Sequence, residues 1–178
     1  MRVGTSSLRR EAQLRALRPD LDVVELRGNV DTRLRRLADG DFDAIVIAYA
    51  GLQRLGRADE GVPLDELVPA AGQGSLALEA RADDPATREW AAKTMDEMGY
   101  VAQQAERALV RALDADCHTP VGALAERVRG GLRLRAFVGR PDGSAWLTDE
   151  LEGPDPEPLG EAVAERLLAA GAAEVLGR

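Results

Sequence analysis

The sequence predicts an α/β fold in which a βαβ part is followed by a small α+β domain with a three-stranded antiparallel sheet. In the first third of the chain, short apolar strand-like runs alternate with helical patterns, which is the order expected of a parallel sheet. In the last third, three strand-like segments are separated by the turn sequences Gly130-Gly131 and Pro141-Asp142-Gly143. Hydrophobic residues make up 45% of the 178 residues, enough for the core of one or two domains.

The βαβ part contains three predicted strands and three predicted helices. Strands are predicted at residues 2–6, 21–26 and 42–48, and helices at residues 8–17, 30–38 and 49–56, the last closed by glycine. Breaker sequences at Pro19-Asp20 and Asp39-Gly40-Asp41 separate them. The run 42–48 is expected to be buried, because strands of parallel sheets are covered on both faces.

The middle of the chain carries weaker signals. Residues 57–68 are polar and predict a crossing between two units. In Pro69–Gly74, two glycines flank Gln73, so the backbone there is either an ordinary turn or a close approach to another group. A strand is predicted at residues 75–80, followed by helices at 86–95 and 100–113.

The last part predicts three strands and one closing helix. The strands are expected at residues 123–128, 132–138 and 145–151, and the helix at 159–170 with Gly171 as its C-terminal cap. Such a succession is typical of a small α+β domain with antiparallel strands.

The net charge and its distribution along the chain limit the kinds of molecule that the protein can bind. The chain has a formal net charge of −8, which argues against general nucleic-acid binding. Residues 1–60 nevertheless hold eleven arginines against ten acidic residues, so the positive charge is concentrated there. No apolar run approaches the ~20 residues of a membrane span and no signal-peptide pattern is present, so we expect a cytoplasmic protein without a membrane partner.

Arginines stand where a parallel sheet would place a ligand. Ser6 or Ser7 can cap the first helix, and Arg9 and Arg10 lie in its first turn, so backbone N–H groups, hydroxyls and guanidinium groups together predict an anion site. A capped surface helix with solvated arginines is an equally good interpretation of these residues alone. Arg27 ends a predicted strand, and Arg33 follows in the next helix.

Cys117 and His118 are the only cysteine and the only histidine in the chain. They are adjacent in a predicted loop, where Cys117 is a buried inert residue, a reactive thiol or a covalent anchor. A Cys–His hydrolase is a further hypothesis. It is disfavoured because adjacent side chains seldom face each other productively and no third group is predicted to orient the histidine.

Five motifs, in this order, resemble the porphobilinogen deaminase (hydroxymethylbilane synthase) family. They are Gly4–Arg10, Leu26–Leu34, Asp43–Ala48, Pro69–Gly74, and Glu106-Arg107 followed by Cys117–Gly122. In the family, two small residues, often Gly-Gly, precede the cysteine, whereas Ala115 and Asp116 stand here. The family's N-terminal portion, about a domain in size, has no counterpart in this chain.

The resemblance implies a three-domain architecture. Residues 1–68 would be the later part of a second domain that is like a periplasmic binding protein. Residues 69–95 would return to an otherwise missing first domain, and residues 96–178 would form the C-terminal α+β domain that carries the cofactor cysteine.

The resemblance also implies a function. The family is a transferase of porphyrin and haem biosynthesis that joins four porphobilinogen molecules into linear hydroxymethylbilane and releases ammonia. Its dipyrromethane cofactor would be bound covalently, as a thioether, through Cys117. The matching cofactor-binding residues are Ser7, Arg9, Arg10, Arg27 and Arg33, and the matching substrate-binding residues are Arg9, Arg27, Arg33 and Arg54.

The same resemblance implies that essential parts lie outside this chain. The family's catalytic aspartate and a neighbouring lysine belong to the missing portion, so no catalytic residue and no metal ligand is predicted here, and the chain is expected to be inactive alone. The implied partners are porphobilinogen and its linear oligomers, bound by a monomer. The alternative is a non-catalytic module that binds a small carboxylate, with Cys117 inert.

Overall fold

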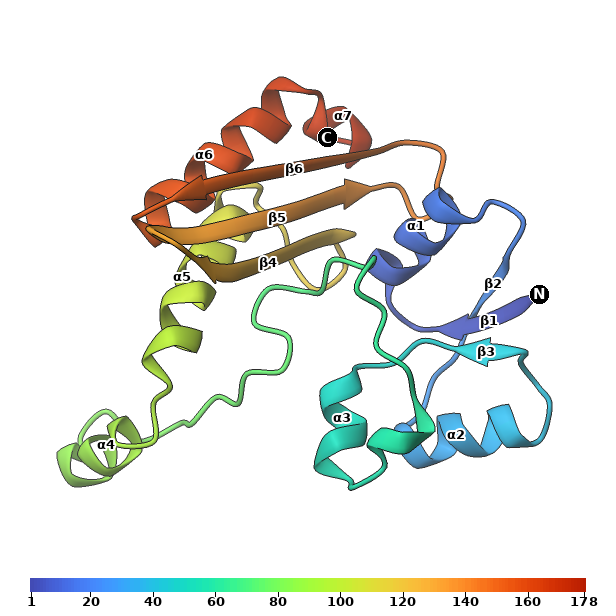
Figure 1. The fold of residues 1–178 in the computed structure, drawn as a ribbon, viewed down its shortest axis with the longest axis horizontal. Coiled ribbons are helices and arrows are strands. Elements are labelled where there is room, and N and C mark those ends of the chain that lie inside the picture. The colour runs from blue at the N-terminus through green and yellow to red at the C-terminus, as the bar shows by residue number, and fades with distance from the viewer.

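The computed structural model describes residues 1–178 as two three-stranded sheets with seven α-helices (Figure 1). One sheet is parallel and the other is antiparallel, which confirms the predicted fold class. The parallel sheet and its helices occupy the N-terminal part, and the antiparallel sheet with α5, α6 and α7 occupies the C-terminal part.

The parallel sheet has the order β2-β1-β3, with β1 (Arg2–Thr5) in the centre. Its other members are β2 (Asp22–Glu25) and β3 (Ala44–Ile45), and the crossovers are α1 (Leu8–Leu17) and α2 (Val30–Ala38). Val3 pairs with Val23 on one side and with Ala44 on the other. Gly4 permits close packing here, because a Cβ atom at this position would lie 2.9 Å from both Leu26 and Phe42.

Side-chain caps begin the two crossover helices. Ser7 accepts a hydrogen bond from the Arg10 N–H at the start of α1, and Asn29 accepts one from the Thr32 N–H at the start of α2. Serine and asparagine are both favoured at helix N-termini, because their side-chain oxygens accept a backbone N–H of the first turn. Each cap therefore fixes the first helical turn at the carboxyl end of a neighbouring strand.

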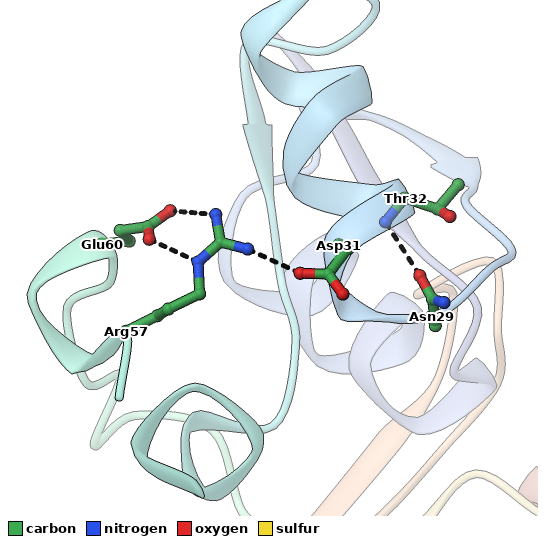
Figure 2. A network of polar contacts seen from close by, with 5 residues as sticks. All are labelled: Asn29, Asp31, Thr32, Arg57 and Glu60. Atoms are coloured by element: carbon green, nitrogen blue, oxygen red, sulfur yellow. Dashed lines mark hydrogen bonds and ion pairs between the residues drawn. The ribbon is translucent and has the colours of Figure 1, made fainter. Parts of the chain in front are cut away.

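One arginine ties the segment after α3 (Tyr49–Arg54) to the start of α2. Figure 2 shows the Arg57 guanidinium group between Asp31 of α2 and Glu60, at the end of the short 3₁₀ helix η1 (Ala58–Glu60). The Nη1 atom lies 2.7 Å from Asp31, and the Nη2 atom lies 2.7 Å from Glu60. The pair of bonds holds the turn after α3 against the N-terminal end of α2.

The third strand is shorter than predicted. Strand geometry covers only Ala44–Ile45 of the predicted 42–48, and residues 44–48 are half-buried instead of buried. The Val46 N–H still bonds to the Gly4 carbonyl at 2.9 Å, after which the chain turns into α3. Because β3 lies at the edge of the sheet, no further strand extends or covers it.

The strand predicted at residues 75–80 is wrong. These residues have no regular secondary structure, and Leu76 and Leu78 are 75% and 67% exposed. A strand requires a hydrogen-bonded neighbour, and neither sheet provides one for this segment. The extended segment leads to α4 (Pro85–Ala92), which projects away from both sheets in Figure 1.

The antiparallel sheet has the order β4-β5-β6 and forms the larger core with α5 and α6. Its elements are α5 (Glu97–Ala112), β4 (Val121–Val128), β5 (Gly131–Gly139), β6 (Trp146–Gly153), α6 (Pro156–Ala169) and α7 (Ala172–Val175). The predicted helix 100–113 starts earlier, at Glu97, because the Asp96 side chain caps it. Gly171 takes a left-handed φ of 98° after α6, as a helix-ending glycine does.

The two parts meet along α1 and the segment around Val68. Ala12 of α1, Val68 and Phe137 of β5 form a buried apolar cluster. The buried Gln13 amide binds both the N–H and the carbonyl of Val68, at 2.7 and 3.0 Å. The Ala123 N–H of β4 donates to the Pro69 carbonyl at 2.9 Å, so this segment is bonded to both parts. No helix in the structure combines the length and apolarity that crossing a membrane requires.

Candidate functional site

Gln73 holds the two arginines at the start of α1. Arg9 is 6% exposed and donates to the Val68 carbonyl and, at 3.0 Å, to the Gln73 Oε1 atom. Arg10 donates to the Val46 carbonyl at 3.2 Å and to the same Gln73 oxygen at 3.5 Å. The pair of predicted arginines is therefore brought together by a side chain that lies more than sixty residues away in sequence.

A third arginine completes a cationic cluster. Arg33 donates to the Gly28 carbonyl at 2.8 Å and to the Ser6 hydroxyl at 3.0 Å. Burial, and secondarily Arg10, lowers the pKa of Arg9 to about 10, and burial, with Arg33, lowers the pKa of Arg10. None of the three forms an ion pair with a carboxylate. Neighbouring cations without a counter-ion are suited to binding an anion.

Two hollows adjoin this cluster. A cleft of about 860 Å³ is lined by Arg54, Gln73 and Gly74 together with residues of α4 and α5. A smaller cavity of about 280 Å³ is lined by Arg9, Arg10 and Gln73, by apolar side chains, and by the carboxylates Glu60 and Asp65, neither of which forms an ion pair with Arg9 or Arg10. Arg54 also donates to the Gly74 carbonyl. Gln73 lines both hollows.

Arg27 does not join the cluster. Its side chain is 82% exposed and donates to the Glu25 carboxylate at 2.7 Å. Ser7, another predicted site residue, uses its hydroxyl to cap α1, whereas Ser6 contacts Arg33. The contact made by Ser6 was not predicted, because the sequence leaves open which of two adjacent serines faces the cluster.

The Cys117 thiol is exposed, and its sulfur lies 3.3 Å from His118 Nδ1. The two neighbouring side chains therefore do contact each other, although the sequence predicted no productive pair. Asp116 accepts bonds from the Thr119 hydroxyl at 2.8 Å and from the His118 N–H at 2.9 Å, which lower the pKa of its carboxyl. Asp116 approaches the same imidazole nitrogen as the thiol does. A hydrolytic triad needs its carboxylate on the other nitrogen, so the hydrolase arrangement is not formed.

The end of α5 fixes the start of the cysteine loop. Asp114 adopts a left-handed φ of 47°, and the hydrogen bonds from Asp114 to Arg111 and from Ala115 to Val110 form a Schellman motif. Arg178 donates to the carbonyls of Leu113 and Asp114 at 2.6 and 2.7 Å. The left-handed position is thus Asp114, and not Ala115 or Asp116.

Replacing Asp114 by glycine is expected to raise the free energy of unfolding by about 0.5–1 kcal/mol, since glycine has no Cβ penalty at this φ. The matched change Asp116→Gly should instead lower stability, because it removes the bonds to Thr119 and His118. Urea unfolding followed by circular dichroism measures both. A stability loss in Asp114→Gly would contradict the assignment of strain to this residue.

Glu106 is absent from the predicted site residues, although it lies in a recognised motif. Glu106 is 7% exposed, and its carboxylate accepts hydrogen bonds from the Gly72 N–H at 2.7 Å and the Ala125 N–H at 2.9 Å. Burial raises its pKa more than the two N–H groups lower it. The sequence did contain a signal for this residue: Glu106 lies near the apolar positions Ala105 and Leu109 of the predicted helix, where a charged side chain is unusual.

Comparisons with known proteins cover nearly the whole chain. Residues 1–89 match the sequence model described as porphobilinogen deaminase, dipyromethane cofactor binding domain. Residues 100–169 match the one described as porphobilinogen deaminase, C-terminal domain. The first match contains the arginine cluster, and the second contains the cysteine loop.

Curated relatives agree with these matches. The porphobilinogen deaminases of Thiobacillus denitrificans and Rubrobacter xylanophilus are each 49% identical to the chain, over 98% and 99% of its length, and that of Geobacillus kaustophilus is 44% identical over 99%. The chain spans 58% of the length of each of these three relatives. The two family matches and these relatives together show that the chain belongs to the porphobilinogen deaminase family.

Proposed function

We propose that this chain is the part of a porphobilinogen deaminase that holds the dipyrromethane cofactor and the growing pyrrole chain. The whole enzyme would join four porphobilinogen molecules, release ammonia at each step and yield hydroxymethylbilane for tetrapyrrole biosynthesis. The observation that carries this proposal is the cluster of Arg9, Arg10 and Arg33, whose guanidinium groups lie together without a carboxylate partner.

The chemistry of the cluster fits the cofactor and the substrate. Each pyrrole carries an acetate and a propionate group, so the bound chain gains negative charge with every addition. A guanidinium group binds a planar carboxylate through two parallel hydrogen bonds, which fixes orientation as well as charge. Arg54 lines the adjoining cleft and would contact substrate. We retain Ser7 and Arg27 as further contacts; Arg27 would have to exchange its bond to Glu25 for a ligand carboxylate.

Cys117 is the proposed covalent anchor. Its thiol is exposed. After losing its proton, the sulfur would add to the methylene carbon that becomes electrophilic when ammonia leaves the pyrrole, and the new C–S bond is a thioether. When bound, the dipyrromethane supplies the nucleophilic pyrrole carbon on which chain growth begins. The protein's own residues bind its carboxylates and hold its attachment point, while the catalytic carboxylate would come from the portion that this chain does not contain.

The division of the chain supports a need for that further portion. We assign residues 1–68 to a binding-protein-like domain, residues 69–95 to a segment of another domain, and residues 96–178 to the C-terminal domain. Leu76, Leu78 and Trp90 are 75%, 67% and 72% exposed, and apolar exposure on this scale is typical of an unfilled interface. We further propose a monomeric, cytoplasmic enzyme, to which a single free cysteine is suited.

Complementation tests this function. The portion of the Thiobacillus denitrificans relative that precedes the region matched by this chain would be co-expressed with the chain, and porphobilinogen consumption and ammonia release would be measured. We expect both only when the two pieces are combined, and slower amide hydrogen exchange in residues 75–80. The same two pieces should show no turnover when this chain carries both Arg9→Met and Arg10→Met. Turnover by the chain alone, or none by a well-folded complex, would contradict the proposal.

A further inference from the structure

The buried carboxylate of Glu106 joins two segments that are distant in sequence. One oxygen accepts the Gly72 N–H and the other accepts the Ala125 N–H of β4. No ion pair involves Glu106, so its bonds are all to backbone amides. Burying a carboxylate costs free energy because it loses its hydration, and this cost is offset only where hydrogen-bond donors face both oxygens. Its partner on one side is the turn that carries Gln73.

The turn is hydrogen-bonded to α5 through Glu106, and its Ala71 packs against the apolar core that α5 helps to form. Gly72 has a φ of 67°, and a Cβ atom there would lie 2.9 Å from Gln103, one helical turn before Glu106. Hydrogen bonds from Gln73 N–H to Ala70 and from Ser75 N–H to Gly72 close the turn. The backbone of Gln73 is therefore held by hydrogen bonds within the turn, and the turn is held to α5 by the Glu106 hydrogen bond together with the packing of Ala71.

We propose that Glu106 is a positioning residue for the arginine pair. It fixes Gly72, Gly72 fixes Gln73, and the Gln73 oxygen accepts hydrogen bonds from Arg9 and Arg10. A carboxylate of the C-terminal domain thus sets the orientation of the guanidinium groups in the α/β part. The inference rests on the proposed function, since it assumes that these guanidinium groups bind carboxylates.

Glu106→Gln is the informative substitution because it keeps the size of the side chain. A carboxylate accepts two N–H groups, whereas a glutamine accepts one and turns an NH₂ group toward the other. The variant would release either Gly72 or Ala125, and the Gly72 turn is the less constrained of the two because Ala125 remains paired within the sheet. The arginine pair would then lose the fixed position of Gln73.

The experiment measures succinate binding by isothermal calorimetry and the Arg9 and Arg10 Nε–H resonances by NMR, in the full 178-residue chain. We expect Glu106→Gln to raise the dissociation constant about five- to tenfold, and to move both resonances as Gln73→Ala does. The double variant should bind no more weakly than Gln73→Ala alone, because residues that act through one another are not additive.

Leu167→Ala is the matched control. Leu167 is buried in the C-terminal core, so its truncation lowers stability while it leaves the hydrogen bonds of Glu106, Gly72 and Gln73 in place. It should leave affinity and arginine resonances unchanged. Additive effects of Glu106→Gln and Gln73→Ala, or wild-type affinity and resonances in Glu106→Gln, would overturn the positioning role. Absence of succinate binding by the wild-type chain would instead count against the proposed function, while the resonances would still decide the role of Glu106.

Discussion

Replacement of Cys117 by serine is expected to abolish the covalent adduct in the complemented enzyme and to lower porphobilinogen consumption at least about a hundredfold. The thiol is exposed and belongs to the only cysteine of this chain, so no other thiol of the chain can substitute for it. A serine hydroxyl is a much weaker nucleophile near neutral pH, because almost none of it is ionised. The Asp116–Thr119 hydrogen bonds should keep the loop in place in the variant.

Intact-protein mass spectrometry detects the adduct directly, since a bound dipyrromethane increases the mass of the protein by a fixed amount. His118→Gln is the matched control: His118 contacts the sulfur at 3.3 Å, but it has no role as the anchor. The control should keep the adduct. A serine variant that retains the adduct would contradict the assignment of Cys117, and loss of the adduct in His118→Gln alone would show that attachment requires the imidazole.

The arginine cluster could be predicted from sequence because its parts are local. A serine cap places Arg9 and Arg10 in the first turn of a helix, and strand ends in a parallel sheet lie at one edge. Arg33 follows from the same rule applied to the next βα unit. Arg27 follows the rule too, yet it pairs with Glu25, because a strand end fixes the position of the backbone but not the direction of a long side chain.

What the sequence could not predict depends on contacts that are distant along the chain. Gln73 and Glu106 join the site through bonds to residues more than thirty positions away, which no local pattern encodes. The strand expected at residues 75–80 has the right alternation of side chains, but pairing decides strand formation, and no neighbour is present. Local rules therefore succeed at caps and turns and fail where the partner is remote.

Gly160→Ala is expected to lower the free energy of unfolding by about 1–3 kcal/mol, although helix propensity alone predicts a gain of about 1 kcal/mol. Gly160 lies inside α6, where that helix packs against α5. A Cβ atom there would lie 2.6 Å from the Ala108 Cβ and 2.8 Å from the Leu109 nitrogen, and closer still to the Ala105 carbonyl. These neighbours are mostly backbone, so the clash can be relieved only by separating the helices.

The matched control for this prediction is Gly51→Ala. Gly51 is also helical, but a Cβ atom there would meet only Val30 at 3.6 Å, an ordinary contact, so this change should be neutral or stabilising. Urea unfolding of both variants separates packing from propensity. Because Ala105 and Ala108 flank Glu106 on α5, separation of the helices should also shift the Gly72 turn and weaken succinate binding. Equal stability of the two variants would contradict the proposed close contact between α5 and α6.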